Sequence, residues 1–133
     1  MTFVLICTGN AAGKGDLQKY FNDTSRKVKE TADPSQKREI LNESFHTMSK
    51  ALDAVESSTL ISNEERTGFD RYKATLQDKQ DELAGLNGYE RVPDEQLNAF
   101  SDYVVQDMEQ AEQYITISLV AALLILILLV LIL

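Results

Sequence analysis

The sequence contains very little cysteine, proline or histidine. Cys7 is the single cysteine, so no disulfide can form within the chain and a disulfide-stabilised scaffold is excluded. The only prolines are Pro34 and Pro93, which leaves long stretches without a residue that breaks a helix. His46 is the only histidine, so a di-iron bundle site, which needs two Glu-x-x-His motifs, is excluded.

Basic residues are absent from the last third of the chain. All 13 Lys and Arg residues lie between Lys14 and Arg91, whereas six acidic residues follow Val92. Cytoplasmic flanks of membrane spans are usually rich in Lys and Arg. The missing bases therefore favour an extracytoplasmic location for the polar domain, with the cytosolic side as the alternative. The net charge of −8 argues against a nucleic-acid partner.

The opening residues match a phosphate-binding loop only in part. An apolar run, Phe3–Ile6, precedes Gly13-Lys14-Gly15, as in a strand followed by a P-loop. However, Thr8 stands where the loop needs its first glycine, and Asp16 stands where it needs a hydroxyl group. The further apolar strands of a parallel sheet are also missing. A P-loop nucleotide-binding enzyme is therefore the most distant of the alternatives.

The same opening residues resemble the end of a secretory signal. The apolar core Phe3–Cys7 is followed by small residues at Gly9 and Ala11, as at a signal-peptidase cleavage site. We therefore predict that residues 1–12 are a signal-peptide remnant. No Lys or Arg precedes the core, so a short N-terminal strand or the start of a helix is the alternative.

The C-terminal residues form a long apolar run. Residues 115–133 read ITISLVAALLILILLVLIL, in which only Thr116 and Ser118 are polar. About twenty apolar residues in a helix cross the hydrocarbon core of a bilayer. We therefore predict a transmembrane helix over 115–133 and a lipid bilayer as partner, with no domain beyond it.

The polar part of the chain, residues 13–114, has the pattern of amphipathic helices. Apolar residues recur at helical spacing over about 16–31, 34–57, 63–84 and 94–114. Asp33-Pro34 and the capping box Ser62–Glu65 mark two helix starts. The predicted fold is all-α: a small antiparallel helical bundle or helical hairpins, with the fourth helix continuing into the single transmembrane helix as one rod.

The apolar stripes of the second and fourth helices are narrow. They resemble coiled-coil seams, and Lys79 and Gln80 interrupt the stripe of the third helix. Narrow stripes favour helices that complete their burial against a second copy or another membrane-complex subunit. The predicted interaction seam consists of Leu41, Phe45, Met48, Leu52, Val55, Phe100, Val104 and Met108.

Residues that could carry chemistry are sparse. Glu43 and His46 form one Glu-x-x-His pair on a helix, which is too few ligands for a metal site. We expect no catalytic residue, cofactor or metal, and therefore no enzyme. The sequence predicts a structural or accessory subunit of a larger membrane assembly. The alternative is a tail-anchored cytosolic coiled-coil protein for tethering or fusion.

Overall fold

The computed structural model describes residues 14–57, 61–115 and 117–132, and these residues form an all-α structure. Within these ranges the chain forms five α-helices and one short 3₁₀ turn, η2 (Asp94–Gln96). The helices are α1 (Lys14–Glu30), α2 (Pro34–Ser57), α3 (Asn63–Ala84), α4 (Leu97–Glu112) and α5 (Ile117–Ile132).

Local capping interactions fix the starts of α2 and α3. The Asp33 carboxylate accepts a hydrogen bond from the Ser35 backbone N–H at 3.1 Å, just before α2. At α3, the Ser62 hydroxyl accepts from the Glu65 N–H at 3.3 Å, and the Ser62 N–H donates to the Glu65 carboxylate at 3.1 Å. These two bonds form the capping box that the sequence predicts.

A glycine in the left-handed region ends α3. Gly85 has φ 78°, and the N–H groups of Gly85 and Leu86 both donate to the carbonyl of Asp81 at 2.8 and 2.9 Å. This conformation is easily adopted only by glycine and satisfies a carbonyl at the helix end. The chain then turns through residues 86–93 toward α4.

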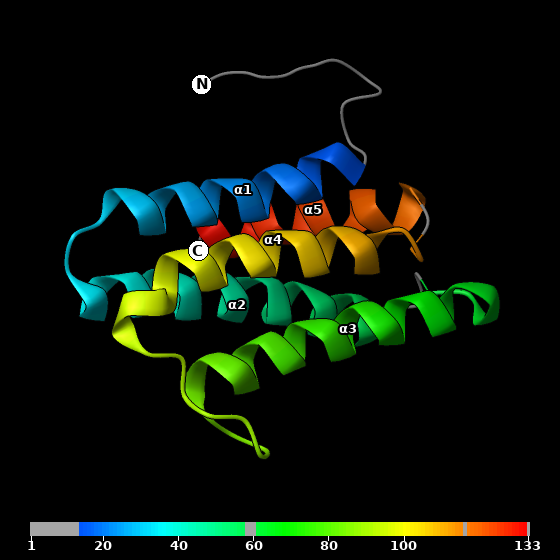
Figure 1. Ribbon diagram of the computed structural model, residues 1–133. Helices are drawn as coiled ribbons and strands as arrows, with labels where there is room; N and C mark the ends of the chain where they lie inside the picture. The colour runs from blue at the N-terminus through cyan, green and yellow to red at the C-terminus, as the bar shows by residue number, and fades with distance from the viewer. Residues whose placement is uncertain (1–13, 58–60, 116, 133) are drawn as a thin grey trace.

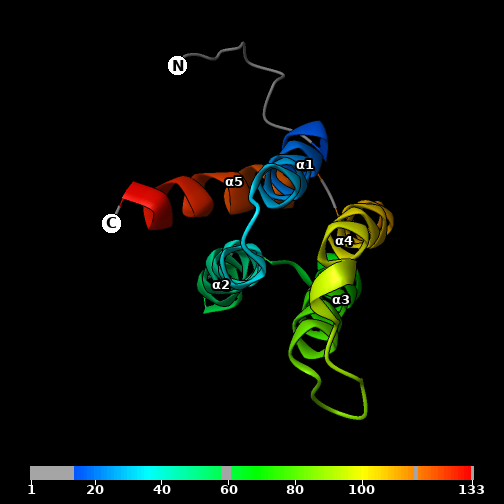
Figure 2. The ribbon, with the colours of Figure 1, turned by 60° about the vertical axis from the view of Figure 1, so that its left-hand side comes forward.

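Helices α1 to α4 form a ring in which each helix contacts the next: α1 with α2, α2 with α3, α3 with α4, and α4 with α1. Figure 1 shows these four helices running side by side. The fifth helix lies outside this ring, against α2 and α1. In Figure 2 the first four helices are seen nearly end-on while α5 is seen from the side, so α5 crosses the bundle obliquely.

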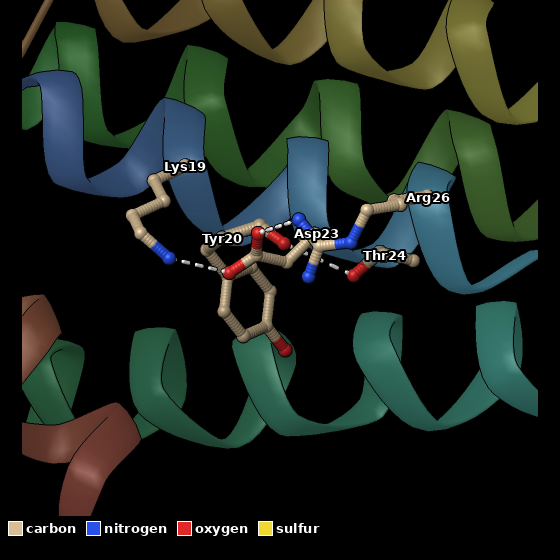
Figure 3. A network of polar contacts seen from close by, with 5 residues as sticks. All are labelled: Lys19, Tyr20, Asp23, Thr24 and Arg26. Atoms are coloured by element: carbon tan, nitrogen blue, oxygen red, sulfur yellow. Dashed lines mark hydrogen bonds and ion pairs between the residues drawn. The ribbon is translucent and has the colours of Figure 1, made fainter. Parts of the chain in front are cut away.

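Both apolar and polar side chains of α1 contact the neighbouring helices. Tyr20 points from α1 toward α2, where its hydroxyl donates to the Ser44 carbonyl at 2.8 Å (Figure 3). The Thr24 and Ser44 hydroxyls are buried and lie 2.8 Å apart. Closer to solvent, Asp23 accepts hydrogen bonds from Lys19 and Arg26 at 2.8 and 2.9 Å. Partial burial alone would raise the pKa of Asp23, but these two cations together lower it.

The predicted continuous helix from residue 94 to the C-terminus is wrong within the described residues. α4 ends at Glu112, and α5 begins at Ile117 and folds back along the bundle. The N–H groups of Gln113, Tyr114 and Ile115 each donate to the carbonyl three residues earlier, a tightening typical of a helix end. The β-branched residues Ile115 and Ile117 flank this break and propagate a helix less readily than Leu or Ala.

None of the helices in the described ranges is both long enough and apolar enough to cross a membrane.

Candidate functional site

The most unusual element of the molecule is α5, because every residue of it except Ser118 is apolar. Among its residues 119–127, whose side chains the structure describes, four side chains are buried against the rest of the protein, at spacings of one, three and four residues. This spacing puts them on one side of a helix. They are Leu119, Val120, Leu123 and Ile127. The bundle therefore covers one stripe of α5.

The other side of α5 is also apolar and is only partly covered. Ile125 is 60% exposed, the highest exposure of any large apolar residue among those the structure describes. Leu124 and Leu126 beside it are partly buried. Figure 2 shows the C-terminal end of α5 extending away from the other helices. Helix α5 thus presents an apolar face that the bundle does not bury.

Helix α3 and the turn before α5 approach each other closely at Gly68. A Cβ atom added at Gly68 would lie 1.9 Å from the carbonyl oxygen of Tyr114. Only a residue without a side chain fits there. Gly68 therefore lets the turn at residues 113–115 pack directly on α3.

The eight residues of the predicted interaction seam lie inside the bundle. Those on α2, namely Leu41, Phe45, Met48, Leu52 and Val55, are fully buried, and Phe100, Val104 and Met108 on α4 are at most 7% exposed. They belong to one apolar core that also includes Leu17, Phe69 and Leu76 from α1 and α3. In this arrangement the seam packs against the chain's own helices and leaves no surface there for a partner.

Four of the six acidic residues that follow Val92 contact polar or basic groups of other helices. A hydrogen bond from Lys29 lowers the pKa of Asp102. Partial burial opposes this effect. The cross-helix pairs are Arg38–Asp94 at 2.8 Å, Lys29–Asp102 at 2.6 Å, Lys79–Asp107 at 2.5 Å and Gln18–Glu109 at 3.0 Å. The fold thus brings three bases from earlier in the sequence onto acids of the base-free C-terminal third.

Lys79 is the residue whose role sequence reasoning missed. It looks like a defect in the apolar stripe of α3, yet its side chain is only 3% exposed. Its ammonium group lies 2.7 Å from Glu82 and 2.5 Å from Asp107. Burial alone would lower the pKa of Lys79, but hydrogen bonds to Asp107 and Glu82 raise it. The partner Asp107 lies 28 residues away, so no local pattern could have revealed it.

Tyr72 of α3 is a second residue with a polar group in the core. Its hydroxyl is fully buried and has no hydrogen-bond partner among the residues that the structure describes. Burial, with the charge of nearby Glu112 as a smaller cause, raises the pKa of Tyr72 well above its ordinary value. A buried hydroxyl without a partner lowers stability.

The two residues considered as metal ligands lie on the surface of α2. Glu43 and His46 are both exposed on α2. No group of three or more His, Cys, Asp or Glu residues in the described ranges could hold a metal ion. The predicted signal remnant, and all of the P-loop-like stretch before Lys14, lie outside the described residues.

Comparison with protein-family models, with curated proteins and with solved structures gives no match for this chain.

Proposed function

We propose that this protein is a non-catalytic single-pass membrane protein, in which α1–α4 are the water-exposed domain and residues 115–133 attach it to a lipid bilayer. One observation carries this proposal. Helix α5 is apolar on all sides apart from Ser118, whereas among its described side chains the bundle buries the stripe that contains Leu119 and Leu123. A helix that is apolar on all sides requires apolar surroundings on all sides.

The energetics favour a bilayer over water for the uncovered face. Burying an exposed Leu or Ile side chain is worth about 1.5–3 kcal/mol. In a bilayer, Ile125 and its partly covered neighbours gain this burial free energy. The buried stripe of α5 exchanges its contacts with α2 for contacts with lipid. Because α1–α4 already contact one another in a closed ring, they keep their neighbours when α5 leaves. We therefore treat the docked helix and the inserted helix as two states of one protein.

Within this proposal the role is that of a structural or accessory subunit that assembles with other membrane proteins or with copies of itself. Since the predicted seam faces inward, assembly contacts come from the outer surfaces of the bundle or from α5. The inward seam also disfavours the coiled-coil tether, which needs Phe45 and Leu52 to face a partner. Crosslinking in the native membrane tests this role, and a monomer without crosslinked neighbours would contradict it.

The proposed orientation places the bundle on the extracytoplasmic side. It rests on the absence of Lys and Arg after Arg91. Translation in the presence of microsomes, followed by protease treatment, tests it. Protection of the bundle is the expected result, and complete digestion would favour the cytosolic side.

Replacing Ile125 by arginine separates folding from membrane insertion. In the docked helix this side chain is 60% exposed, so an Ile125→Arg variant should keep the bundle's helical content and urea midpoint. Near the middle of a membrane span, the same arginine costs about 2.5–3.5 kcal/mol of insertion free energy. The expected result is loss of carbonate-resistant membrane integration, with Ile125→Leu as the matched control that retains it. Unchanged integration of the arginine variant would contradict the proposal.

A further inference from the structure

A groove of about 380 Å³ lies between α3 and α4, on helices that Figure 2 places away from the C-terminal end of α5. We call it the tyrosine groove. The three tyrosines Tyr89, Tyr103 and Tyr114 and the three acids Asp78, Glu82 and Asp107 line it.

The groove gathers most of the exposed aromatic surface of the protein. Five large apolar side chains are exposed in the described ranges, and three of them are the groove tyrosines, at 42–56% exposure. Tyrosine is enriched where proteins bind other proteins, because its ring gives a large contact area and its hydroxyl a hydrogen bond. Three such rings around one groove therefore indicate a binding surface.

The chain's own cations show which chemistry these rings accept. The ammonium of Lys79 lies 3.7 Å from the centre of the Tyr103 ring, and the guanidinium of Arg71 lies 4.1 Å from that of Tyr114. Both distances are within the range of cation–π attraction. Glu82 and Asp107 complete the surroundings of the Lys79 ammonium. The groove walls are thus built for positively charged nitrogen groups.

The groove has capacity for a further cation. Its three carboxylates outnumber its two cations, Arg71 and Lys79, so its formal charge is negative. Asp78 is exposed and forms no hydrogen bond or ion pair with another described residue. The charge of Asp78 raises the pKa of the Tyr89 hydroxyl, so the two side chains interact electrostatically. Tyr89 and Asp78 therefore offer an aromatic ring and a free carboxylate. Lys79 is held by the same two kinds of group, from Tyr103 and Asp107.

We propose that the tyrosine groove binds a lysine- or arginine-bearing segment of a partner protein, with the cationic side chain between Tyr89 and Asp78. The net charge of −8 of the whole chain draws a basic partner toward this surface. The lining tyrosines Tyr103 and Tyr114 are about three helical turns apart, roughly 16 Å, which suits an extended peptide better than one lipid headgroup. The proposed position of the cation, between Tyr89 and Asp78, involves no residue of α5.

The test uses the full-length protein in mild detergent, with its five tyrosines replaced by 3-fluorotyrosine so that each gives a ¹⁹F NMR signal. The probe is the capped peptide Ala-Lys-Ala-Ala-Lys-Ala, and its Nε-acetylated form is the neutral control. We expect saturable shifts of the Tyr89, Tyr103 and Tyr114 signals, whereas the signals of Tyr20 and Tyr72 stay fixed. The acetylated peptide should bind about tenfold more weakly, because both of its cations are gone.

Two variants locate the binding. Asp78→Asn and Tyr89→Ala change exposed side chains and should each weaken the peptide about fivefold. Asp70→Asn is the matched control, since Asp70 is an exposed acid of α3 that does not line the groove. Equal weakening by Asp78→Asn and Asp70→Asn would overturn the proposal, as would equal binding of the acetylated peptide. Groove signals that move with phosphatidylcholine vesicles, and not with the peptide, would also overturn it and assign the groove to lipid.

Discussion

Substituting Gly68 by alanine adds a single methyl group where α3 meets the turn before α5. In an ordinary helix interior the change stabilises a protein by about 1 kcal/mol, because alanine is the better helix former. The sequence of α3 alone therefore predicts that Gly68→Ala stabilises the protein. The fold predicts that Gly68→Ala destabilises it, because the new Cβ would lie 1.9 Å from the Tyr114 carbonyl oxygen and 2.8 Å from the carbonyl carbon.

The magnitude follows from the size of this overlap. Ordinary contacts of a Cβ atom begin at 3.4 Å, so the Tyr114 carbonyl has to move by about 1.5 Å. The obstacle is backbone, which cannot rotate away as a side chain would. Overpacking of this kind costs up to about 3 kcal/mol, and the helix-propensity gain offsets about 1 kcal/mol of it. We expect a net loss of about 2 kcal/mol in the free energy of unfolding.

Urea unfolding of the full-length chain, followed by far-UV circular dichroism, measures this loss. Gly15→Ala is the matched control, because Gly15 also lies in a helix and a Cβ atom there meets nothing within 4 Å. The control should be neutral or stabilising by up to about 1 kcal/mol. A Gly68→Ala variant as stable as the parent would refute the packing of the 113–115 turn on α3.

Three further predictions concern the buried and paired polar groups. Tyr72→Phe removes an unpartnered hydroxyl and should raise the free energy of unfolding by about 1 kcal/mol in urea titrations; a loss of stability would mean that the hydroxyl is bonded. Lys79→Met leaves its two carboxylate partners, which are 19% and 26% exposed, without their cation and should cost about 1–3 kcal/mol. The pKa values of Tyr72 and Lys79 are both raised, so ionisation of the Tyr72 hydroxyl and loss of the Lys79 charge each cost stability as pH rises above roughly 10. Each variant should therefore flatten the alkaline limb of the stability profile. The lowered pKa of Asp23 acts in the other direction: its contribution is present above roughly pH 4 and lost below it, so Asp23→Asn should flatten the acid limb. Unchanged profiles would contradict these assignments.

The sequence predicted those parts of the fold that are encoded locally. The bounds of α2 and α3 coincide with the predicted ranges because Asp33-Pro34, Ser62 and Gly85 act through residues only a few positions away. The apolar stripes likewise identify the buried side of each helix, since helical spacing alone decides which residues share a face.

The break between α4 and α5 could not be predicted from the local sequence. No Gly or Pro follows Pro93, and the turn packs on Gly68, more than forty residues earlier in the chain. Lys79 appeared to interrupt a stripe because its partner Asp107 is distant in sequence. The groove tyrosines follow no local period and come together only when α3 and α4 pack. Each of these features is set by contacts between helices.

The position of residue 125 relative to the bilayer tests the central claim most directly. In a Cys7→Ser background, an Ile125→Cys variant carries an environment-sensitive fluorophore on the exposed side of α5. With vesicles present, we predict a blue-shifted emission that nitroxide groups on lipid acyl chains quench and aqueous iodide does not. An emission that stays red-shifted and fully quenched by iodide would place this face of α5 in water and contradict the account.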